Sequence, residues 1–371
     1  MMLKKFAVTN YKNFKERTEL DFGAVRNYAF NENCIRDGLL NKVILLGKNG
    51  SGKSNLGMAI FDIVGTLTEN VVHYRQTDQA SFLNGDSNKK TATFEYVFKE
   101  LDSVISYSYR KTDARTIVFE ELKVDGKLIF MREDAVGEYP GLEALGAGQL
   151  RVDIKNGPLS ILRYIYANTV QKLNSPITKV MNFVNHMLYF KSDTESNGFI
   201  GYGKSGELIY DYIIKNGLTP DFQTMLKEIA DIDAKLEVVK IPGTNGVVAQ
   251  KFSKKKLPFD QNASTGTKVF ALFYYWYKHL KEVSFVYMDE FDAYYHYEMA
   301  EKIVRLVIDV EMCQTVFTTH NVSLLKNDLM RPDCYLVLER DGIRSFSDST
   351  ERELRQGHNI EKMYRNGEFD D

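Results

Sequence analysis

The sequence predicts an α/β fold with an added antiparallel β subdomain and an inserted helical lobe. Three observations lead to this prediction. The apolar run 43–46 leads directly into a glycine-rich turn and a helix-forming segment, as a buried parallel strand followed by its helix does. Residues 91–130 alternate in polarity like successive strands, whereas residues 159–235 show helical periodicity.

Composition restricts the class of protein before any motif is considered. Of the 371 residues, 44% are hydrophobic and 12% aromatic, which is enough for a sizeable folded core. A formal charge of -2 does not favour binding of nucleic acid or an anionic membrane by the whole chain, although a local basic groove stays open as an alternative. The cysteines are few and widely spaced, and no apolar run approaches about 18 residues. We therefore expect a soluble, untargeted protein of the cytoplasm with no membrane contact.

Residues 1–158 are predicted to form the N-terminal half of a core domain. Alternating polarity over 3–8 and again over 18–22 predicts a β-hairpin at the N-terminus. The run 43–46 predicts a strand buried on both faces, and residues 91–130 predict further strands joined by polar turns. Together these segments predict a central sheet with an antiparallel subdomain beside it.

Residues 159–235 are predicted to be a helical lobe inserted into that core. Met187 and Leu188 fall on a helical face with earlier apolar residues, and the polar stretch 191–205 predicts an exposed loop. The remainder, 236–371, is predicted to be the C-terminal half of the core.

The most specific motif follows the apolar run 43–46. Residues 47–54 read Gly-Lys-Asn-Gly-Ser-Gly-Lys-Ser and match the P-loop pattern GxxxxGK[ST] at every fixed position. In this pattern backbone N–H groups surround the phosphates of a nucleotide, while Lys53 reaches the β- and γ-phosphates and Ser54 ligates Mg²⁺. The sequence therefore predicts ATP and Mg²⁺ as ligands. The predicted nucleotide-binding residues are Gly47, Asn49, Gly50, Ser51, Gly52, Lys53, Ser54 and Asn55.

The apolar segment 285–288 is followed by two carboxylates, which a site for phosphoryl transfer needs beside a P-loop. Asp289 is predicted to hold Mg²⁺ through its water shell, and Glu290 to act as general base on the attacking water. His320 follows the C-terminal end of the predicted strand 314–318. One predicted helix separates this strand from the acidic strand, so that we expect His320 near the γ-phosphate. Lys53, Glu290 and His320 are the predicted catalytic residues.

A turn that reads Ser264-Thr265-Gly266-Thr267 precedes an aromatic helical run. A serine before a helix is a common N-cap, and the N-terminus of a helix also attracts anions. From these residues alone, helix capping explains the turn, and phosphate binding is the alternative.

The order of these parts resembles that of the ATP-binding-cassette (ABC) superfamily. Within it, the chain looks like the SMC, RecF and OLD (overcoming lysogenization defect) ATPases, and most closely like compact bacterial ATPases of abortive-infection operons. Residues 6–15 and 364–369 are similar to corresponding segments of that family. The resemblance implies an ABC-type (SMC/RecF-like) P-loop ATPase head. It further implies that the turn 264–267 contacts the γ-phosphate bound to a second protomer, so that a homodimer or larger homo-oligomer encloses ATP.

The chain departs from that family at three points. Its turn reads Ser-Thr-Gly-Thr where the family has Ser-Gly-Gly-Gln, which implies slow hydrolysis. The glutamine that follows the first helix in many ABC ATPases has two counterparts, Gln76 and Gln79, and the sequence does not choose between them. His296 matches a family histidine, but the proline after it is missing, so its helix is expected to begin differently.

The resemblance implies a sensor or regulator in bacterial antiviral defence (abortive infection). The segment after His320 is too short for a nuclease domain of about 100 residues, so no fused TOPRIM nuclease is expected. The expected partner is a separate effector protein, a nuclease or toxin, and the expected trigger is DNA or a phage protein.

A second hypothesis is a RecF/SMC-like DNA-repair ATPase that binds duplex DNA in an ATP-dependent way. Lys251 and 254–256 form a basic cluster before the turn at Ser264, as a phosphate-binding groove requires, but lysine runs are also common in solvated loops. A transporter subunit is disfavoured, because Ser264 follows Lys53 at a greater distance than in that group.

Overall fold

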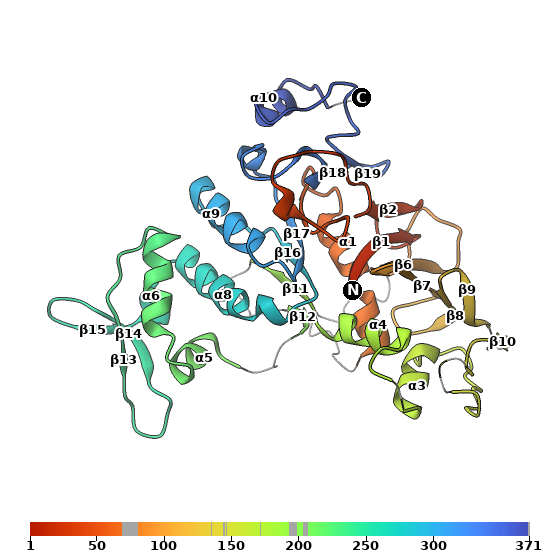
Figure 1. Ribbon diagram of the computed structural model, residues 1–371. Coiled ribbons are helices and arrows are strands. Elements are labelled where there is room, and N and C mark those ends of the chain that lie inside the picture. The colour runs from red at the N-terminus through yellow and green to blue at the C-terminus, as the bar shows by residue number, and fades with distance from the viewer. Residues whose placement is uncertain are drawn as a thin grey trace.

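The computed structural model describes residues 1–68, 81–134, 136–143, 145, 147–170, 172–192, 199–202 and 207–369. Within these ranges there are two large sheets with helices packed against them, and a small lobe projects to one side (Figure 1). No helix in the same ranges is long and apolar enough to span a membrane. The predicted α/β fold with an antiparallel subdomain is confirmed.

The first large sheet is mixed and mostly parallel. In the described chain its order is β12-β11-β16-β17-β5-β18-β19. The five inner strands run parallel, and each edge strand is antiparallel to its neighbour. Their bounds are β5 Lys42–Leu46, β11 Met187–Lys191, β12 Phe199–Gly201, β16 Phe285–Asp289, β17 Gln314–Thr318, β18 Tyr335–Leu338 and β19 Ile343–Ser345. Strands β5, β16 and β17 are buried along their whole length. Burial on both faces explains why the sequences of β5 and β16 are continuous and largely apolar runs.

The second large sheet is antiparallel and has the order β10-β9-β8-β7-β6-β1-β2. Its strands are β1 Met2–Thr9, β2 Thr18–Asp21, β6 Ala92–Glu100, β7 Ser103–Lys111, β8 Ile117–Val124, β9 Lys127–Glu133 and β10 Val136–Glu138. Inward and outward residues alternate along β6, as predicted for a sheet with one buried face. The N-terminal hairpin and the predicted strands of 91–130 are thereby confirmed.

Helix α1 (Lys53–Ile60) contacts both large sheets. Tyr96 of β6 donates a hydrogen bond to the carbonyl of Ala59 at 3.1 Å, and Tyr287 of β16 donates to the carbonyl of Lys53 at 2.5 Å. Gly57 allows the close approach to β16, because a Cβ there would lie 2.6 Å from the Tyr287 ring. The helix that begins at the P-loop is therefore fixed from two sides.

The region predicted as a helical lobe differs from its prediction. Met187–Lys191 is strand β11 of the main sheet, and Phe199–Gly201 is strand β12 rather than part of a loop. A short apolar run such as Met187–Phe190 fits a buried strand as well as a helix face, so its periodicity could not decide between them. The strand next to β16 thus comes from inside the segment that was expected to be helical.

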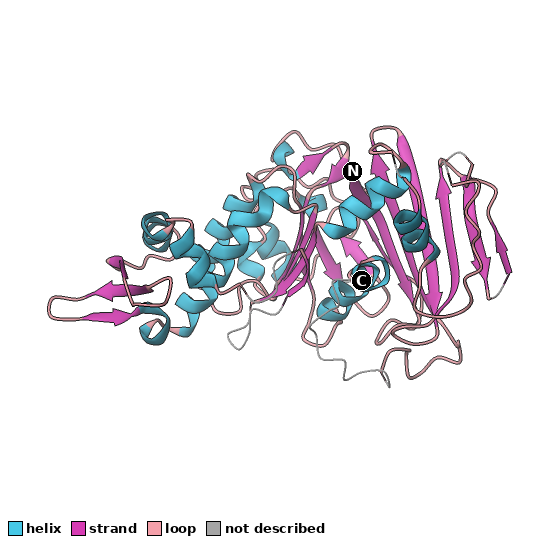
Figure 2. Cartoon of the chain, turned by 90° about the horizontal axis from the view of Figure 1, so that it is seen from below, coloured by secondary structure: helices cyan, strands magenta, loops and turns pink. Residues whose placement is uncertain are grey.

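A small lobe projects beyond the main sheet (Figure 2). It holds a three-stranded sheet of β13, β14 and β15, which we call the β arm (residues 236–258). The strands are β13 Leu236–Val239, β14 Val247–Lys251 and β15 Lys256–Pro258. The helices outside α1 are α2 Asp62–Leu67, α3 Ile161–Asn168, α4 Pro176–Asn185, α5 Ile209–Lys215, α6 Thr219–Glu228, α7 Phe259–Asn262, α8 Thr265–His279, α9 Tyr297–Ile308 and α10 Ile360–Arg365.

Candidate functional site

The P-loop forms the turn between β5 and α1, as the sequence predicts. Leu46 ends the strand and Lys53 begins the helix, so that residues 47–52 make the turn. Gly50 and Gly52 have φ of 75° and 107°, a backbone region that side chains with a Cβ rarely adopt. The predicted nucleotide-binding residues all lie in this turn or in the first turn of α1, and their contacts with a nucleotide stay a prediction.

Lys53 and His320 meet at this turn. The Nζ atom of Lys53 donates to the carbonyl of Gly47 at 2.8 Å and lies 2.9 Å from Nε2 of His320. Burial lowers the pKa of Lys53, although the nearby charge of Asp289 opposes this. The pKa of His320 is also lowered, first by burial and then by the charge of Lys53. The lowered pKa of His320 favours its neutral imidazole, which can accept a hydrogen bond from Lys53.

Asp289 and Glu290 stand at the end of β16, beside β17. Asp289 is fully buried, and its two oxygens accept hydrogen bonds from Thr318 at 2.8 Å and from Tyr189 at 3.0 Å. The Thr318 hydroxyl also accepts a hydrogen bond from the backbone N–H of Glu290 at 2.7 Å. Glu290 has φ of 48°, an uncommon conformation for a residue other than glycine. One hydroxyl thus holds both acidic residues.

Lys191 is a site residue that the sequence did not reveal. It ends β11, opposite Asp289 in the parallel register, and its Nζ lies 2.9 Å from Oε2 of Glu290. The sequence signal for Lys191 was a lysine at the end of an apolar run, but that run was interpreted as helix.

Gln76 and Gln79, the two predicted glutamines, lie outside the described residues.

Asn13 is a second site residue that was not predicted, although it lies in the segment 6–15 that resembles the family. Its side-chain amide donates to the carbonyl of Ser51 at 3.2 Å and accepts from the Asn55 amide at 2.7 Å. A Cβ on Gly52 would lie 2.2 Å from the Asn13 amide nitrogen. The loop after β1 therefore supports the P-loop from outside, which also explains why residue 52 is a glycine.

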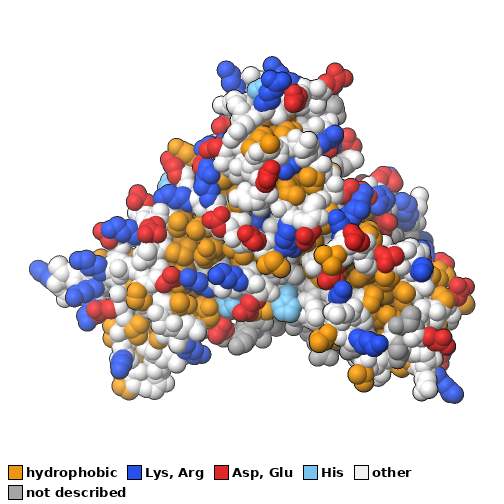
Figure 3. All heavy atoms as spheres, viewed as in Figure 1, with side chains coloured by type: hydrophobic (Ala, Val, Ile, Leu, Met, Phe, Trp, Pro, Cys, Tyr) orange, Lys and Arg blue, Asp and Glu red, His pale blue; other side chains and the backbone are white. Residues whose placement is uncertain are grey.

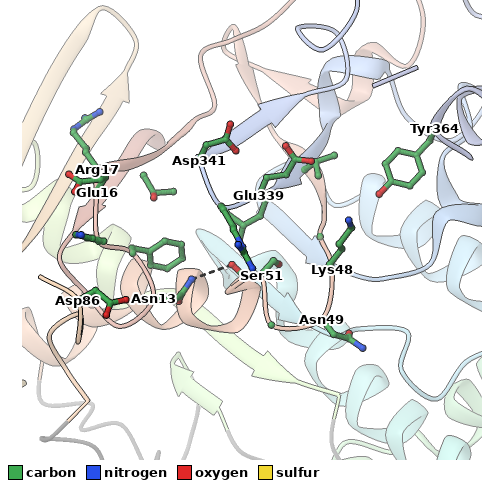
Figure 4. Close-up of a pocket in the computed structure, with 18 residues that line it drawn as sticks. Asn13, Glu16, Arg17, Lys48, Asn49, Ser51, Asp86, Glu339, Asp341 and Tyr364 are labelled. Atoms are coloured by element: carbon green, nitrogen blue, oxygen red, sulfur yellow. Dashed lines mark hydrogen bonds between the residues drawn. The ribbon is translucent and has the colours of Figure 1, made fainter. Parts of the chain in front are cut away.

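A cavity of about 1040 Å³ lies beside the P-loop (Figure 4). It is lined by residues 13–18, the P-loop residues 47–51, Asp86, the end of β18 with the turn after it (337–341), and Tyr364. Ligand pockets in proteins have volumes of about 300–1,000 Å³. A nucleotide whose phosphates lie on the P-loop therefore has space for its sugar and base.

The residues near the P-loop fit Mg²⁺ only together with a nucleotide. Ser54 supplies a hydroxyl and Asp289 a carboxylate, the oxygen donors that Mg²⁺ prefers. Within the described ranges no group of three or more His, Cys, Asp or Glu side chains could hold a metal ion. Since Mg²⁺ is usually bound by one or two protein oxygens, substrate phosphates and waters, this donor set suits it.

The turn 264–267 begins helix α8, with Ser264 as the N-cap. The hydroxyl of Ser264 accepts a hydrogen bond from the backbone N–H of Thr267 at 3.3 Å and lies 2.8 Å from the Thr267 hydroxyl. Ser264 and Thr265 are exposed, Gly266 is half-buried, and Thr267 is buried. His296 is exposed at the N-cap of α9, which begins at Tyr297. Contacts of these residues with a second protomer stay a prediction.

Three neighbouring strand ends thus converge, with the P-loop after β5, the carboxylates after β16 and His320 after β17. Together these strand ends have the arrangement of a P-loop site at the carboxyl edge of a mostly parallel α/β sheet. A family described as "AAA domain, putative AbiEii toxin, Type IV TA system" matches residues 212–326. No curated protein sequence matches the chain.

Solved SMC heads are similar at low identity. An SMC head bound to the C-winged helix domain of ScpA is 15% identical with a TM-score of 0.49, and the match covers 93% of this chain and 97% of that one. The SMC head domain from Thermotoga maritima is 14% identical with a TM-score of 0.42, covering 91% and 94%. A head with an extended coiled coil bound to a ScpA domain, from Pyrococcus furiosus, is 12% identical with a TM-score of 0.42, covering 93% and 95%.

Proposed function

We propose that this chain binds and hydrolyses ATP between two copies of itself. We further propose that it acts in the bacterial cytoplasm as the sensor or regulator of an anti-phage system with a separate effector, such as a TOPRIM nuclease. The observation that carries the ATPase proposal is the convergence of Lys53, Glu290 and His320 at adjacent strand ends. Phosphoryl transfer needs positioned cations and a group that orients the attacking water, and these residues supply both.

Each residue has a distinct task in this proposal. Lys53 binds the β- and γ-phosphates, and His320 lies close enough to Lys53 to respond to the γ-phosphate. Ser54 and Asp289 would hold Mg²⁺, which neutralises charge that develops on the phosphates. Glu290 accepts the proton of the attacking water. The hydrogen bonds of Thr318 and Tyr189 keep the Asp289 side chain in place at the end of β16.

The exposed turn at Ser264 supports a site shared between two copies. Within the described residues, the hydrogen bonds of the Ser264 hydroxyl stay inside its own turn. Helix α8 is 15 residues long, so its N-terminus carries a partial positive charge that favours an anion. A γ-phosphate bound to the P-loop of a second copy is an anion of the kind that this turn would accept.

The defence role rests on the family resemblance and on the matched family description, which names a putative toxin of a toxin–antitoxin system. The test combines ATP turnover by the purified chain with a pull-down from its host. We expect Glu290→Gln to lower turnover by at least about 100-fold, as loss of a general base does. We also expect a second chain, encoded nearby, to co-purify. A chain that neither binds ATP nor retains a partner would exclude this function.

The β arm favours DNA binding as a second candidate function. Lys240, Lys251 and residues 254–256 are all exposed there, and Glu237 is the one acidic residue of the segment. Blue side chains gather at the tip of the projecting lobe in Figure 3. Such a surface can bind the phosphate backbone of duplex DNA, with an affinity that falls steeply with salt.

The test of this candidate compares two triple variants in salt-dependent DNA binding with ATP. Lysines 254, 255 and 256 are replaced by alanine in one variant. The control removes the exposed Lys127, Lys155 and Lys172 outside the arm. Weaker binding and a shallower salt slope in the arm variant alone would support DNA binding by the β arm. Equal effects of both variants would count against it.

A further inference from the structure

Lys191 lies where the main sheet presents Glu290 to the P-loop. Strand β11 runs parallel to β16, with Lys191 opposite Asp289, one residue before Glu290. The Lys191 ammonium lies 2.9 Å from Oε2 of Glu290, and both side chains are about one-third exposed, 34% and 35%. The ion pair therefore stands at the mouth of the site and outside the hydrophobic core.

The position of the Glu290 carboxylate depends on this contact. The Glu290 backbone is fixed by the hydrogen bond to Thr318, but its side chain has three rotatable bonds beyond that point. Among the described residues, the ion pair with Lys191 is the one hydrogen bond or ion pair recorded for this carboxylate. One oxygen is therefore held, and the other oxygen stays available.

We propose that Lys191 is a positioning residue for Glu290, an assignment that rests on the proposed ATPase function. Lys191 holds Oε2 so that Oε1 faces the water that attacks the γ-phosphate. As the water oxygen bonds to the γ-phosphorus, its proton passes to Oε1. The bond from the γ-phosphorus to the β–γ bridging oxygen breaks, and its electron pair leaves with ADP. Lys191 keeps its own protons and touches no reacting atom.

This role differs from that of an ordinary surface ion pair. A pair with this exposure contributes little to the free energy of unfolding, so loss of Lys191 should leave stability nearly unchanged. A carboxylate that is free to rotate spends less time in the reactive geometry, and small misplacements lower turnover by as much as about 100-fold. The effect of removing Lys191 should therefore appear in kcat.

The experiment measures kcat and KM for ATP, together with calorimetric binding of a non-hydrolysable ATP analogue. Lys191→Ala is the test variant, and Lys191→Arg keeps the positive charge. Lys179→Ala is the matched control, because Lys179 forms a similar ion pair with Glu100 at 2.8 Å, with exposures of 30% and 28%, outside the site. Each variant is also made in the Glu290→Gln protein.

We expect Lys191→Ala to lower kcat about tenfold or more, with KM and analogue affinity changed by less than about twofold. Lys191→Arg should restore most of the rate, and Lys179→Ala should match the wild type. In the Glu290→Gln protein, Lys191→Ala should cause no further loss, because both changes act through one carboxylate.

An unchanged kcat in Lys191→Ala would overturn the assignment. A loss confined to KM and analogue affinity would overturn it too, because Lys191 would then bind the nucleotide. If the wild type itself has no turnover, the proposed ATPase function fails. If the wild type is active and Lys191→Ala is equally active, the assignment of Lys191 fails and the proposed ATPase function stands.

Discussion

The Thr318 hydroxyl links the two acidic residues of the site, so Thr318→Val tests how that site is held together. The change keeps the shape of the side chain and removes a donor to Asp289 and an acceptor for the Glu290 N–H. A hydrogen bond to a charged group contributes about 1.5–3 kcal/mol, and an unpaired buried N–H costs about 1–3 kcal/mol. Tyr189 still bonds Asp289, so we expect a loss of about 3 kcal/mol in the free energy of unfolding.

The assay for Thr318→Val combines urea unfolding with ATP turnover, and Thr318→Ser is the control that retains the hydroxyl. Glu290 is held at φ of 48°, which costs about 1 kcal/mol or more, and release of its N–H lets the backbone relax. Turnover should then fall about tenfold or more, while nucleotide affinity is retained. Wild-type unfolding and turnover in Thr318→Val would show that the Thr318 hydroxyl does not hold the two acidic residues.

Two further predictions concern the support of the P-loop helix and a buried charge. Gly57→Ala should lower the free energy of unfolding by about 1–2 kcal/mol, because the new Cβ would lie 2.6 Å from the Tyr287 ring. Gly65→Ala, at an exposed position of α2, should raise the free energy of unfolding by up to about 1 kcal/mol. The urea midpoints of these two variants should shift in opposite directions. A shift of both midpoints in the same direction would contradict the packing argument. Burial lowers the pKa of Lys42 from 10.5 to about 8. Between these two pH values the unfolded chain binds more protons than the folded chain, so the free energy of unfolding rises with pH. The total rise is about 3 kcal/mol. Lys42→Met should flatten this rise when unfolding is measured at several pH values from about 8 to about 10.5, and an unchanged slope would show that another group causes it.

Much of the candidate site could be predicted because each part depends on a few consecutive residues. The glycines at 50 and 52 are needed for a left-handed backbone, and the buried parallel strands at 43–46 and 285–289 require apolar runs. Because parallel strands present their carboxyl ends at one edge of a sheet, local patterns were enough to predict that these ends meet.

The parts that could not be predicted depend on contacts between distant segments. Asn13 reaches the P-loop because the loop after β1 packs on α1, and no local pattern shows that contact. Lys191 reaches Glu290 because β11 pairs with β16, although almost a hundred residues separate them in the sequence. The run before Lys191 fits a helix or a strand equally well, and only the pairing with β16 makes it a strand.

Mass determination of the purified protein with ATP and Mg²⁺ tests whether two copies share a composite ATP site. The comparison includes the wild type, Glu290→Gln and Lys53→Ala. We predict that Glu290→Gln traps an assembly of two or more copies with bound nucleotide, and that Lys53→Ala does not form it. The same mass and nucleotide content for all three proteins would contradict the shared site.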